Sequence, residues 1–222
     1  MIIDFTHIIE QLPELGRSIG VTLTIWLVGT AGALVLGFWV TLGLRFGPRP
    51  LGWLLASYVE VIRGTPFLIQ LFLLYYGGPF IGIALDPIPA GLLGVTVYGA
   101  AYFSEIFRAG FDAVPRGHVE AAQCLGLTRR QIIFRIEVPE MTMLVLPPAV
   151  NMTVIILKET AVLSIITVPE LTFLMQAIGS QQYAFVEALA VLALFYWGMV
   201  SLAGRLGQFA EARLSKFTFS NT

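Results

Sequence analysis

Long apolar stretches dominate the chain, and short polar or proline-rich segments separate them. The apolar stretches cover about residues 19–44, 51–80, 90–111, 141–157 and 184–206. An α-helix needs about 20 mainly apolar residues to cross a bilayer, and it satisfies its backbone hydrogen bonds internally. The pattern therefore predicts an all-α integral membrane protein with five transmembrane helices, organised as a single transmembrane domain over residues 1–222.

The composition agrees with this pattern, because 57% of the residues are hydrophobic and only 12% are charged. A soluble domain is nearer half apolar and a quarter charged. The net charge is −1 and no basic face carries interleaved aromatic residues, so we expect no nucleic-acid binding. Cys124 is the single cysteine, and the only histidines, His7 and His118, are far apart. We therefore expect neither an internal disulfide nor a metal site.

The basic residues fall almost entirely on one side of a five-span arrangement, where cytoplasmic loops are expected to carry them. The residues on that side are Arg45, Arg49, Arg116, Arg129, Arg130, Arg135, Arg205, Arg213 and Lys216. Only Arg17 and Lys158 fall on the other side. We therefore expect the N-terminus outside, the C-terminus in the cytoplasm, and the long polar segment 114–139 in the cytoplasm.

Segment 114–139 reads VPRGHVEAAQCLGLTRRQIIFRIEVP and lies between two apolar stretches. A short helix fits residues 119–125, and Gly126 follows where a left-handed C′ residue is expected. Thr128 and Gln131 have the spacing of a capping box for a second helix. Pro139 lacks a backbone N–H and is expected to stop or kink that helix. The segment is thus predicted to form a helix, a glycine corner and a helix, the shape of a docking element.

Catalytic sequence patterns are absent from the chain. Its only lysines are Lys158 and Lys216, and neither belongs to the Gly-rich phosphate-binding loop of ATPases. No Gly-x-Ser-x-Gly elbow and no metal-ligand pair occurs. We therefore expect no enzymatic activity and no cofactor in this chain, so the energy for any active process comes from a gradient or from a partner.

Four blocks of sequence resemble the permease subunits of ABC importers. Glu120, Ala121 and Ala122, then Gly126, Ile136 and Pro139, resemble the EAA loop of that family. Segments 60–77, 100–122 and 157–171 resemble the polar amino-acid branch, the histidine, glutamine and arginine type. The four blocks occur in the family's order and cover most of the chain between residues 59 and 171.

The resemblance implies the type I ABC importer permease fold and a place in the bacterial inner membrane. It implies a permease subunit of an ATP-driven importer for a polar amino acid or a related small zwitterionic solute. Two permeases, either two copies or this chain with a paralogous permease, would form the pathway. Two ATP-binding cassette ATPase subunits would bind ATP and Mg, and an external solute-binding protein would deliver the solute.

The resemblance also implies that 114–139 is a coupling loop seated in a groove of the ATPase. The coupling residues that it implies are Glu120, Ala121, Ala122, Gly126 and Arg129. Glu120 can pair with the ATPase or provide favourable charge in the first turn of a helix. The two alanines let surfaces approach closely, Gly126 supplies backbone geometry, and Arg129 contacts either the ATPase or anionic lipid headgroups.

Four residues interrupt the second apolar stretch: Arg63, Gly64, Thr65 and Pro66. We predict a kink here that lines the pathway or its gate, because Pro66 frees the carbonyl of Ile62. A charge at this depth is costly unless it is paired or hydrated. Arg63 can pair with Glu60 or with another span, and the alternative to a gate is a structural kink with an internal ion pair.

The substrate pathway is predicted to include the polar end of the fourth span: Lys158, Glu159 and Thr160. Glu159 would suit the ammonium group of a zwitterionic solute, while the carboxylate of that solute would suit a cation or a helix N-terminus. The alternative is a hydrated helix end. Gln70, Tyr98 and Tyr102 have polar tips inside the second and third spans, and either line the same cavity or serve in packing and interhelical hydrogen bonds.

Two departures from the family pattern stand out. Glu137 and Glu140 are charged where the family has an apolar residue and Gln, and the sequence offers no reason for them. The family usually has Lys-Asp-Thr-Ser after the fourth span, whereas residues 158–161 of this chain are Lys-Glu-Thr-Ala.

A second interpretation is a gradient-driven secondary transporter or channel that works alone. It would need an ion site among Glu60, Glu105 and Glu159, and five spans without an internal repeat argue against it. The sequence does not decide the substrate's identity or charge, nor between a homodimer and a heterodimer.

Overall fold

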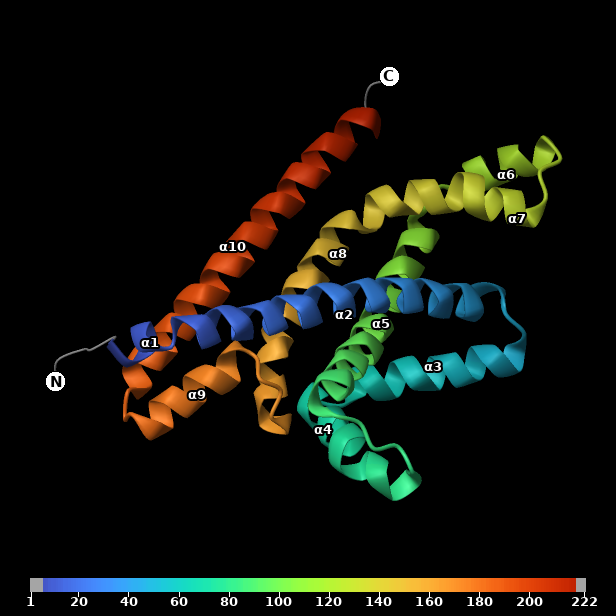
Figure 1. The fold of residues 1–222 in the computed structure, drawn as a ribbon. Helices are drawn as coiled ribbons and strands as arrows, with labels where there is room; N and C mark the ends of the chain where they lie inside the picture. Colours follow the sequence, from blue (N-terminus) through green and yellow to red (C-terminus); the bar gives the residue numbers. More distant parts are fainter. Residues whose placement is uncertain (1–5, 219–222) are drawn as a thin grey trace.

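The structure is a computed structural model that describes the backbone of residues 6–218 and the side chains of residues 8–209. Over this range the chain is helical and contains no strand. Figure 1 shows long helices crossing one another, with shorter helices between them. In chain order the elements are α1 (Thr6–Glu10), α2 (Leu12–Phe46), α3 (Arg49–Gly64), α4 (Phe67–Phe72), the π-helix η1 (Leu73–Gly77), the 3₁₀ helix η2 (Gly78–Ile81), α5 (Pro87–Ala113), α6 (Arg116–Cys124), α7 (Arg129–Ile132), the π-helix η3 (Ile133–Glu137), α8 (Val138–Glu159), the 3₁₀ helix η4 (Thr160–Ile166), α9 (Leu171–Gln181) and α10 (Phe185–Thr218).

Within the part of the chain that the structure describes, four helical segments are long and apolar enough to cross a membrane: Leu12–Phe46, Pro87–Ala113, Arg129–Ile166 and Phe185–Phe209. A fifth candidate is a broken pair, Arg49–Gly64 with Phe67–Ile81, whose halves meet at 112°. Counting this pair as one span gives the five spans that the apolar pattern predicts. The break between these two halves coincides with Pro66, which cannot donate a helical hydrogen bond.

Helices α2 and α5 form the most extensively packed pair, and small residues allow their close approach. A Cβ atom added to Gly37 of α2 would lie 2.8 Å from Phe103 Cβ and 2.9 Å from the carbonyl oxygen of Ala100. Thr41 Oγ1 lies 2.9 Å from the carbonyl oxygen of Ser104, which adds a buried polar contact between the two helices.

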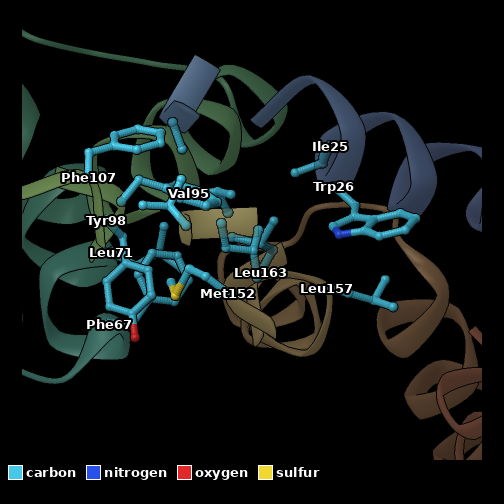
Figure 2. Packing of buried hydrophobic residues seen from close by; sticks show 14 of the residues in the cluster. Ile25, Trp26, Phe67, Leu71, Val95, Tyr98, Phe107, Met152, Leu157 and Leu163 are labelled. Atoms are coloured by element: carbon cyan, nitrogen blue, oxygen red, sulfur yellow. The ribbon is translucent and has the colours of Figure 1, made fainter. Parts of the chain in front are cut away.

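The main core lies where α2, α4, α5, α8 and η4 meet. Figure 2 shows Val95, Phe67 and Leu71 on one side of Met152 and Leu163, with Trp26 and Leu157 on the other. The indole Nε1 of Trp26 donates a hydrogen bond to the carbonyl oxygen of Thr153 (2.9 Å), which ties α2 to α8. A second cluster packs α9 against α10, with residues such as Leu171, Met175 and Leu192.

The fourth span begins earlier than the apolar pattern predicts, because the helix from Arg129 continues through Pro139. Pro139 does not stop the helix, and the π-helix η3 immediately precedes it. A π-turn shifts the hydrogen-bonding register, which accommodates a residue without an N–H. As a result, α7 is directly continuous with the membrane span, and the α6–α7 corner lies at the opposite end of the helices from α9 (Figure 1).

Candidate functional site

The corner between α6 and α7 has the geometry that the sequence predicts. Gly126 adopts φ +75°, and the N–H groups of Gly126 and Leu127 donate to the carbonyls of Gln123 (2.9 Å) and Ala122 (3.2 Å). These two bonds form a Schellman motif, which closes the C-terminus of α6. The structure thus confirms the helix–glycine–helix arrangement, with α6 starting at Arg116 instead of residue 119.

The capping box is also present at the start of α7. The Thr128 N–H donates to Gln131 Oε1 (2.8 Å), and the Gln131 N–H donates to Thr128 Oγ1 (3.4 Å). Both sides of the corner are therefore closed by local hydrogen bonds, and the corner needs no partner to hold its shape.

The residues implied for ATPase coupling do not share one environment. Glu120, Ala121, Gly126 and Arg129 are exposed, whereas Ala122 is only 4% exposed. Ala122 therefore packs within this chain, and only Ala121 of the two alanines is presented outward. The Arg129 guanidinium lies 5.1 Å from the ring centroid of Phe46, a cation–π contact with the end of α2.

The break between α3 and α4 is held by Gln70. Its Nε2 lies 2.7 Å from the carbonyl oxygen of Ile62, which Pro66 leaves without a helical donor. The same nitrogen lies 3.0 Å from the carbonyl oxygen of Thr65 and 2.9 Å from Thr65 Oγ1. Gln70 was predicted either to line the substrate pathway or to serve in packing and hydrogen bonds, and its amide donors satisfy the broken backbone.

Arg63, beside this break, pairs with another span. Its Nη1 lies 3.2 Å from Glu105 Oε2 of α5, and no ion pair with Glu60 forms within the described residues. Arg108 holds the same carboxylate, with contacts of 2.7 and 3.0 Å. Of the two pairings considered for Arg63, the structure has the one between spans.

A cavity of about 370 Å³ opens beside Arg63 and is lined by Tyr102, Glu105, Leu144 and Pro148, among others. It lies between α3, α5 and α8. The Arg63 guanidinium sits 5.7 Å from the centroid of the Tyr102 ring. The cavity therefore presents a cation, a carboxylate and an aromatic face.

The Tyr98 and Tyr102 rings contact each other in a tilted arrangement with centroids 4.8 Å apart, and the Phe67 ring centroid lies 4.8 Å from that of Tyr98. Tyr98 is only 8% exposed and belongs to the core (Figure 2), whereas Tyr102 is half-buried and lines the cavity. The structure thus brings Arg63, Tyr102 and Tyr98 into one series of neighbours.

The three residues at the end of α8 differ in exposure. Lys158 is exposed, Glu159 is half-buried and Thr160 is fully buried. The Thr160 hydroxyl donates to the carbonyl oxygen of Leu157 (2.6 Å). Thr160 therefore serves the helix end, and Lys158 and Glu159 are the two with free surface for a solute.

Glu170 is a buried acid that the sequence interpretation did not single out. It is 0% exposed, and its carboxylate accepts from the N–H groups of Thr172 (2.9 Å) and Phe173 (2.8 Å) at the start of α9. Burial raises the pKa of this carboxyl to about 7, although the backbone donors act in the opposite direction. Its place just before a helix was the available signal, because an acidic side chain there can cap the free N–H groups.

Metal-ligating side chains do not converge within the described residues. No group of three His, Cys, Asp or Glu side chains lies close enough to hold an ion there.

Comparison with known proteins places the chain in a family. The family model described as "Binding-protein-dependent transport system inner membrane component" matches residues 33–216. "Probable amino-acid ABC transporter permease protein YckA" of Bacillus subtilis is 32% identical, over 94% of this chain and 92% of its own length. "Probable amino-acid ABC transporter permease protein PatM" of Vibrio harveyi is 34% identical, over 96% of this chain and 97% of its own length.

Solved structures agree with this placement. A structure described as "Crystal structure of an amino acid ABC transporter with histidines" has a TM-score of 0.88 and 30% identity, over 96% of this chain and 100% of the other. The MetNI methionine ABC transporter in an inward-facing form has a TM-score of 0.74 at 20% identity, over 92% of this chain and 96% of the other, and supports the fold alone. These relatives do not support the interpretation as a stand-alone secondary transporter or channel. The chain belongs to the binding-protein-dependent transport system inner membrane components, and it is a multi-pass permease subunit of a bacterial ABC importer with the type I permease fold.

Proposed function

We propose that this permease imports a polar amino acid or a related small zwitterionic solute. Support comes from relatives described as permeases for amino acids, among them the arginine permease ArtQ and the L-cystine permease TcyB of Bacillus subtilis. The glutamine permease GlnP of Escherichia coli is 31% identical over 87% of this chain. Because these solutes differ in side chain, the proposal covers the amino-acid class and names no single compound.

The complete transporter that we propose contains two permeases, either two copies of this chain or this chain with a paralogue. Two ATPase subunits bind ATP and Mg and carry out hydrolysis, since this chain has no phosphate-binding loop. An external solute-binding protein delivers the solute. The N-terminus lies outside and the C-terminus in the cytoplasm, as the distribution of arginines favours, and residues 1–222 act as one transmembrane domain.

The docking surface for the ATPase is the exposed face of the α6–α7 corner, which carries Glu120 and Ala121. The observation that supports this most strongly is the closure of the corner by its own hydrogen bonds while its outer face stays exposed. A stiff corner transmits displacement, whereas a flexible loop would dissipate it. When ATP closes the ATPase dimer, the two permeases' corners approach each other and the spans rock to the outward-facing state.

The solute passes the cavity beside Arg63 and Tyr102 and the half-buried carboxylate of Glu159. Arg63 suits a carboxylate, while Glu159 and the tyrosine faces suit an ammonium group. The residues 63–66 form the gate, because the 112° break gives this span two halves that can move separately.

The docking proposal is tested with Cys124, the exposed and only cysteine, which lies in the last turn of α6. A thiol-reactive photocrosslinker is attached there in the assembled transporter with its ATPase and binding protein. We expect the permease to cross-link to the ATPase, and Glu120→Lys to reduce that yield. Cross-linking only to lipid or to the second permease would contradict the proposal.

The substrate proposal is tested with Glu159→Gln in reconstituted transporter, with Glu60→Gln as a control at an exposed site of α3. Hydrogen bonds to charged groups contribute about 1.5–3 kcal/mol. We therefore expect the apparent affinity for an amino acid to fall by roughly tenfold or more with Glu159→Gln and to stay unchanged with Glu60→Gln. Equal affinities in all three proteins would remove Glu159 from the pathway.

A further inference from the structure

Glu137 and Glu140, which the sequence left unexplained, both fasten the 114–139 segment to the rest of the molecule. Glu140 of α8 lies 2.9 Å from His118 Nδ1 of α6 through each of its carboxylate oxygens. Glu137, at the end of η3, lies 3.5 Å from Arg45 Nη2 in the last turn of α2. One acid therefore links α6 to α8, and the other links the segment to a different span.

Arg45 is the centre of a three-way contact. Its Nη1 lies 2.5 Å from Asp112 Oδ1, in the last turn of α5, while its Nη2 faces Glu137. The guanidinium also lies 5.4 Å from the ring centroid of Phe111 and 5.7 Å from that of Phe46. A planar guanidinium can bridge two carboxylates and stack on rings at once, which an ammonium group cannot do. One side chain thus joins the ends of α2, α5 and η3.

Glu137 depends on this contact, because it is only 7% exposed and its one ion pair among the described residues is with Arg45. An ionised group removed from water is costly unless it keeps a partner. Two cavities of about 450 and 540 Å³ lie beneath α6, and both are lined by Arg45, Gln123 and Glu137. The ionic contact therefore bridges a region where α6 is not tightly packed against the spans.

The contacts continue along α5 to the broken span. Asp112 Oδ2 lies 3.8 Å from Arg108 Nη1, Arg108 Nη2 lies 2.7 Å from Glu105 Oε2, and that oxygen lies 3.2 Å from Arg63 Nη1. Arg63 precedes the break at Pro66. Alternating charges thus run without interruption from the 114–139 segment to the break: Glu137, Arg45, Asp112, Arg108, Glu105 and Arg63.

We propose that α5 is a strut that couples the 114–139 segment to the break in the second span, with an ionic joint at each end. The joint near the 114–139 segment consists of Arg45, Asp112 and Glu137. The joint near the break consists of Arg63 and Glu105. Helix α5 is the rigid body between them, since Glu105 and Asp112 are about two turns apart. Glu137, Arg45, Asp112 and Glu105 are positioning residues that act on the gate through α5, whereas Arg63 belongs to the proposed gate itself. The inference rests on the proposed docking of the 114–139 segment on the ATPase.

Stiffness of α5 alone does not couple the ends, because a joint must hold at both of them. Arg108 and Asp112 are about half exposed, at 50% and 52% of their side-chain surface, so their mutual contact contributes little. One acid at each joint is better shielded, since the side chains of Glu137 and Glu105 are 10% and 24% exposed. The two joints, and not the ion pairs along α5, are therefore the sites where coupling is lost by mutation.

The test measures solute imported per ATP hydrolysed by the complete transporter in proteoliposomes. The variants are Glu137→Gln, Glu105→Gln and their combination, with Arg49→Gln and Glu60→Gln as exposed controls on α3. Links between sites typically change equilibria by 5-fold or more. We expect each joint variant to lower the ratio by about fivefold or more, and the combination to lower it no further than the more severe single variant. Ratios that multiply in the combination, or that stay unchanged in the singles, would overturn the strut.

Two further measurements keep the result interpretable. Arg45→Lys retains the charge but not the fork, so we expect a smaller loss than with Glu137→Gln, and it replaces that variant if Glu137→Gln does not fold. Cross-linking from Cys124 to the ATPase reports docking independently of transport. If the protein without substitutions gives no cross-link to the ATPase, the docking proposal is overturned. If cross-linking is preserved and the joint variants leave the ratio of solute imported to ATP hydrolysed unchanged, the strut alone is overturned.

Discussion

At the scale of single residues, Gly126 shows how one backbone conformation sets the direction of an exposed element. Its φ of +75° lies in the left-handed region, and nothing lies within 4 Å of where a Cβ would be. Space is therefore available, and only the backbone conformation requires glycine. A residue other than glycine would move the end of α6 relative to α7 or strain the turn between them.

We expect Gly126→Val to destabilise the corner by about 1–2 kcal/mol, the cost of a left-handed residue, and to uncouple transport from ATP hydrolysis. Membrane insertion should be unaffected, because the spans themselves are unchanged. Transport and stimulated ATPase activity of the reconstituted protein measure the effect. Gly126→Asn is the matched control, since Asn tolerates this conformation. Normal coupling in the Val variant would show that the corner's geometry is not needed.

Glu170 makes stability depend on pH. Its folded-state pKa is about 7, above the ordinary value of 4.5, so the folded protein binds this proton more tightly than the unfolded chain does. The contribution is fully present below pH 4.5 and is lost as the pH rises through 7. The total loss is at most about 3 kcal/mol. Glu170→Gln keeps an oxygen that can cap α9 but has no proton to lose.

The prediction for Glu170 is a difference between two proteins. Between pH 5 and pH 8 the melting temperature of the original protein should fall relative to that of Glu170→Gln. Thermal unfolding in detergent measures both curves, and the Gln variant corrects for every other titrating group. Parallel curves over this range would mean that burial of Glu170 does not shift its proton affinity.

At the scale of elements, helices α2 and α5 depend on the absence of a side chain at Gly37. A Cβ there would meet a backbone oxygen and a Cβ at under 3 Å, and neither can move without shifting α5. We expect Gly37→Ala to destabilise the protein by about 1–3 kcal/mol. Gly52→Ala in α3 is the control, because nothing lies within 4 Å of its added Cβ. Thermal unfolding compares the two, and equal stability would show that α2 and α5 can separate at no cost.

Local hydrogen bonding explains which features of these elements the sequence could predict. The Gly126 turn and the Thr128–Gln131 box involve residues within a few positions of one another, so spacing alone identifies them. The continuation of the helix through Pro139 was missed, because a π-turn before a proline leaves no simple pattern.

Contacts between distant segments account for what the sequence could not predict in the candidate site. Glu137 meets Arg45 only after the end of α2 has packed beside η3, which lies far from it in the sequence. Gln70 similarly is a polar residue within a predicted span. Its hydrogen bond to the carbonyl of Ile62 depends on the 112° break between α3 and α4. Side-chain type identified a polar residue in both cases, but the partner of each depends on the folded arrangement.

At the scale of the whole molecule, the charge distribution and the fold together predict one orientation in the membrane. The α6–α7 corner, with Arg116, Arg129 and Arg130, lies at the opposite end of the helices from α9. Because cytoplasmic loops carry the excess of arginine and lysine, the corner should face the cytoplasm. The same orientation is needed if a cytoplasmic ATPase is to reach it.

Cys124 allows this orientation to be measured without any substitution, since it is exposed in α6 and is the chain's only cysteine. We expect a membrane-impermeant maleimide to label inverted membrane vesicles and to leave intact spheroplasts unlabelled until they are permeabilised. Cys124→Ser supplies the background, and a cysteine introduced at exposed Phe80, near the end of the broken span, should show the opposite pattern. A single span, Pro87–Ala113, lies between Phe80 and Cys124 in the sequence. The two residues are therefore expected on opposite sides of the membrane. Labelling of Cys124 in intact spheroplasts would reverse the topology, and the proposed docking on a cytoplasmic ATPase would then be impossible.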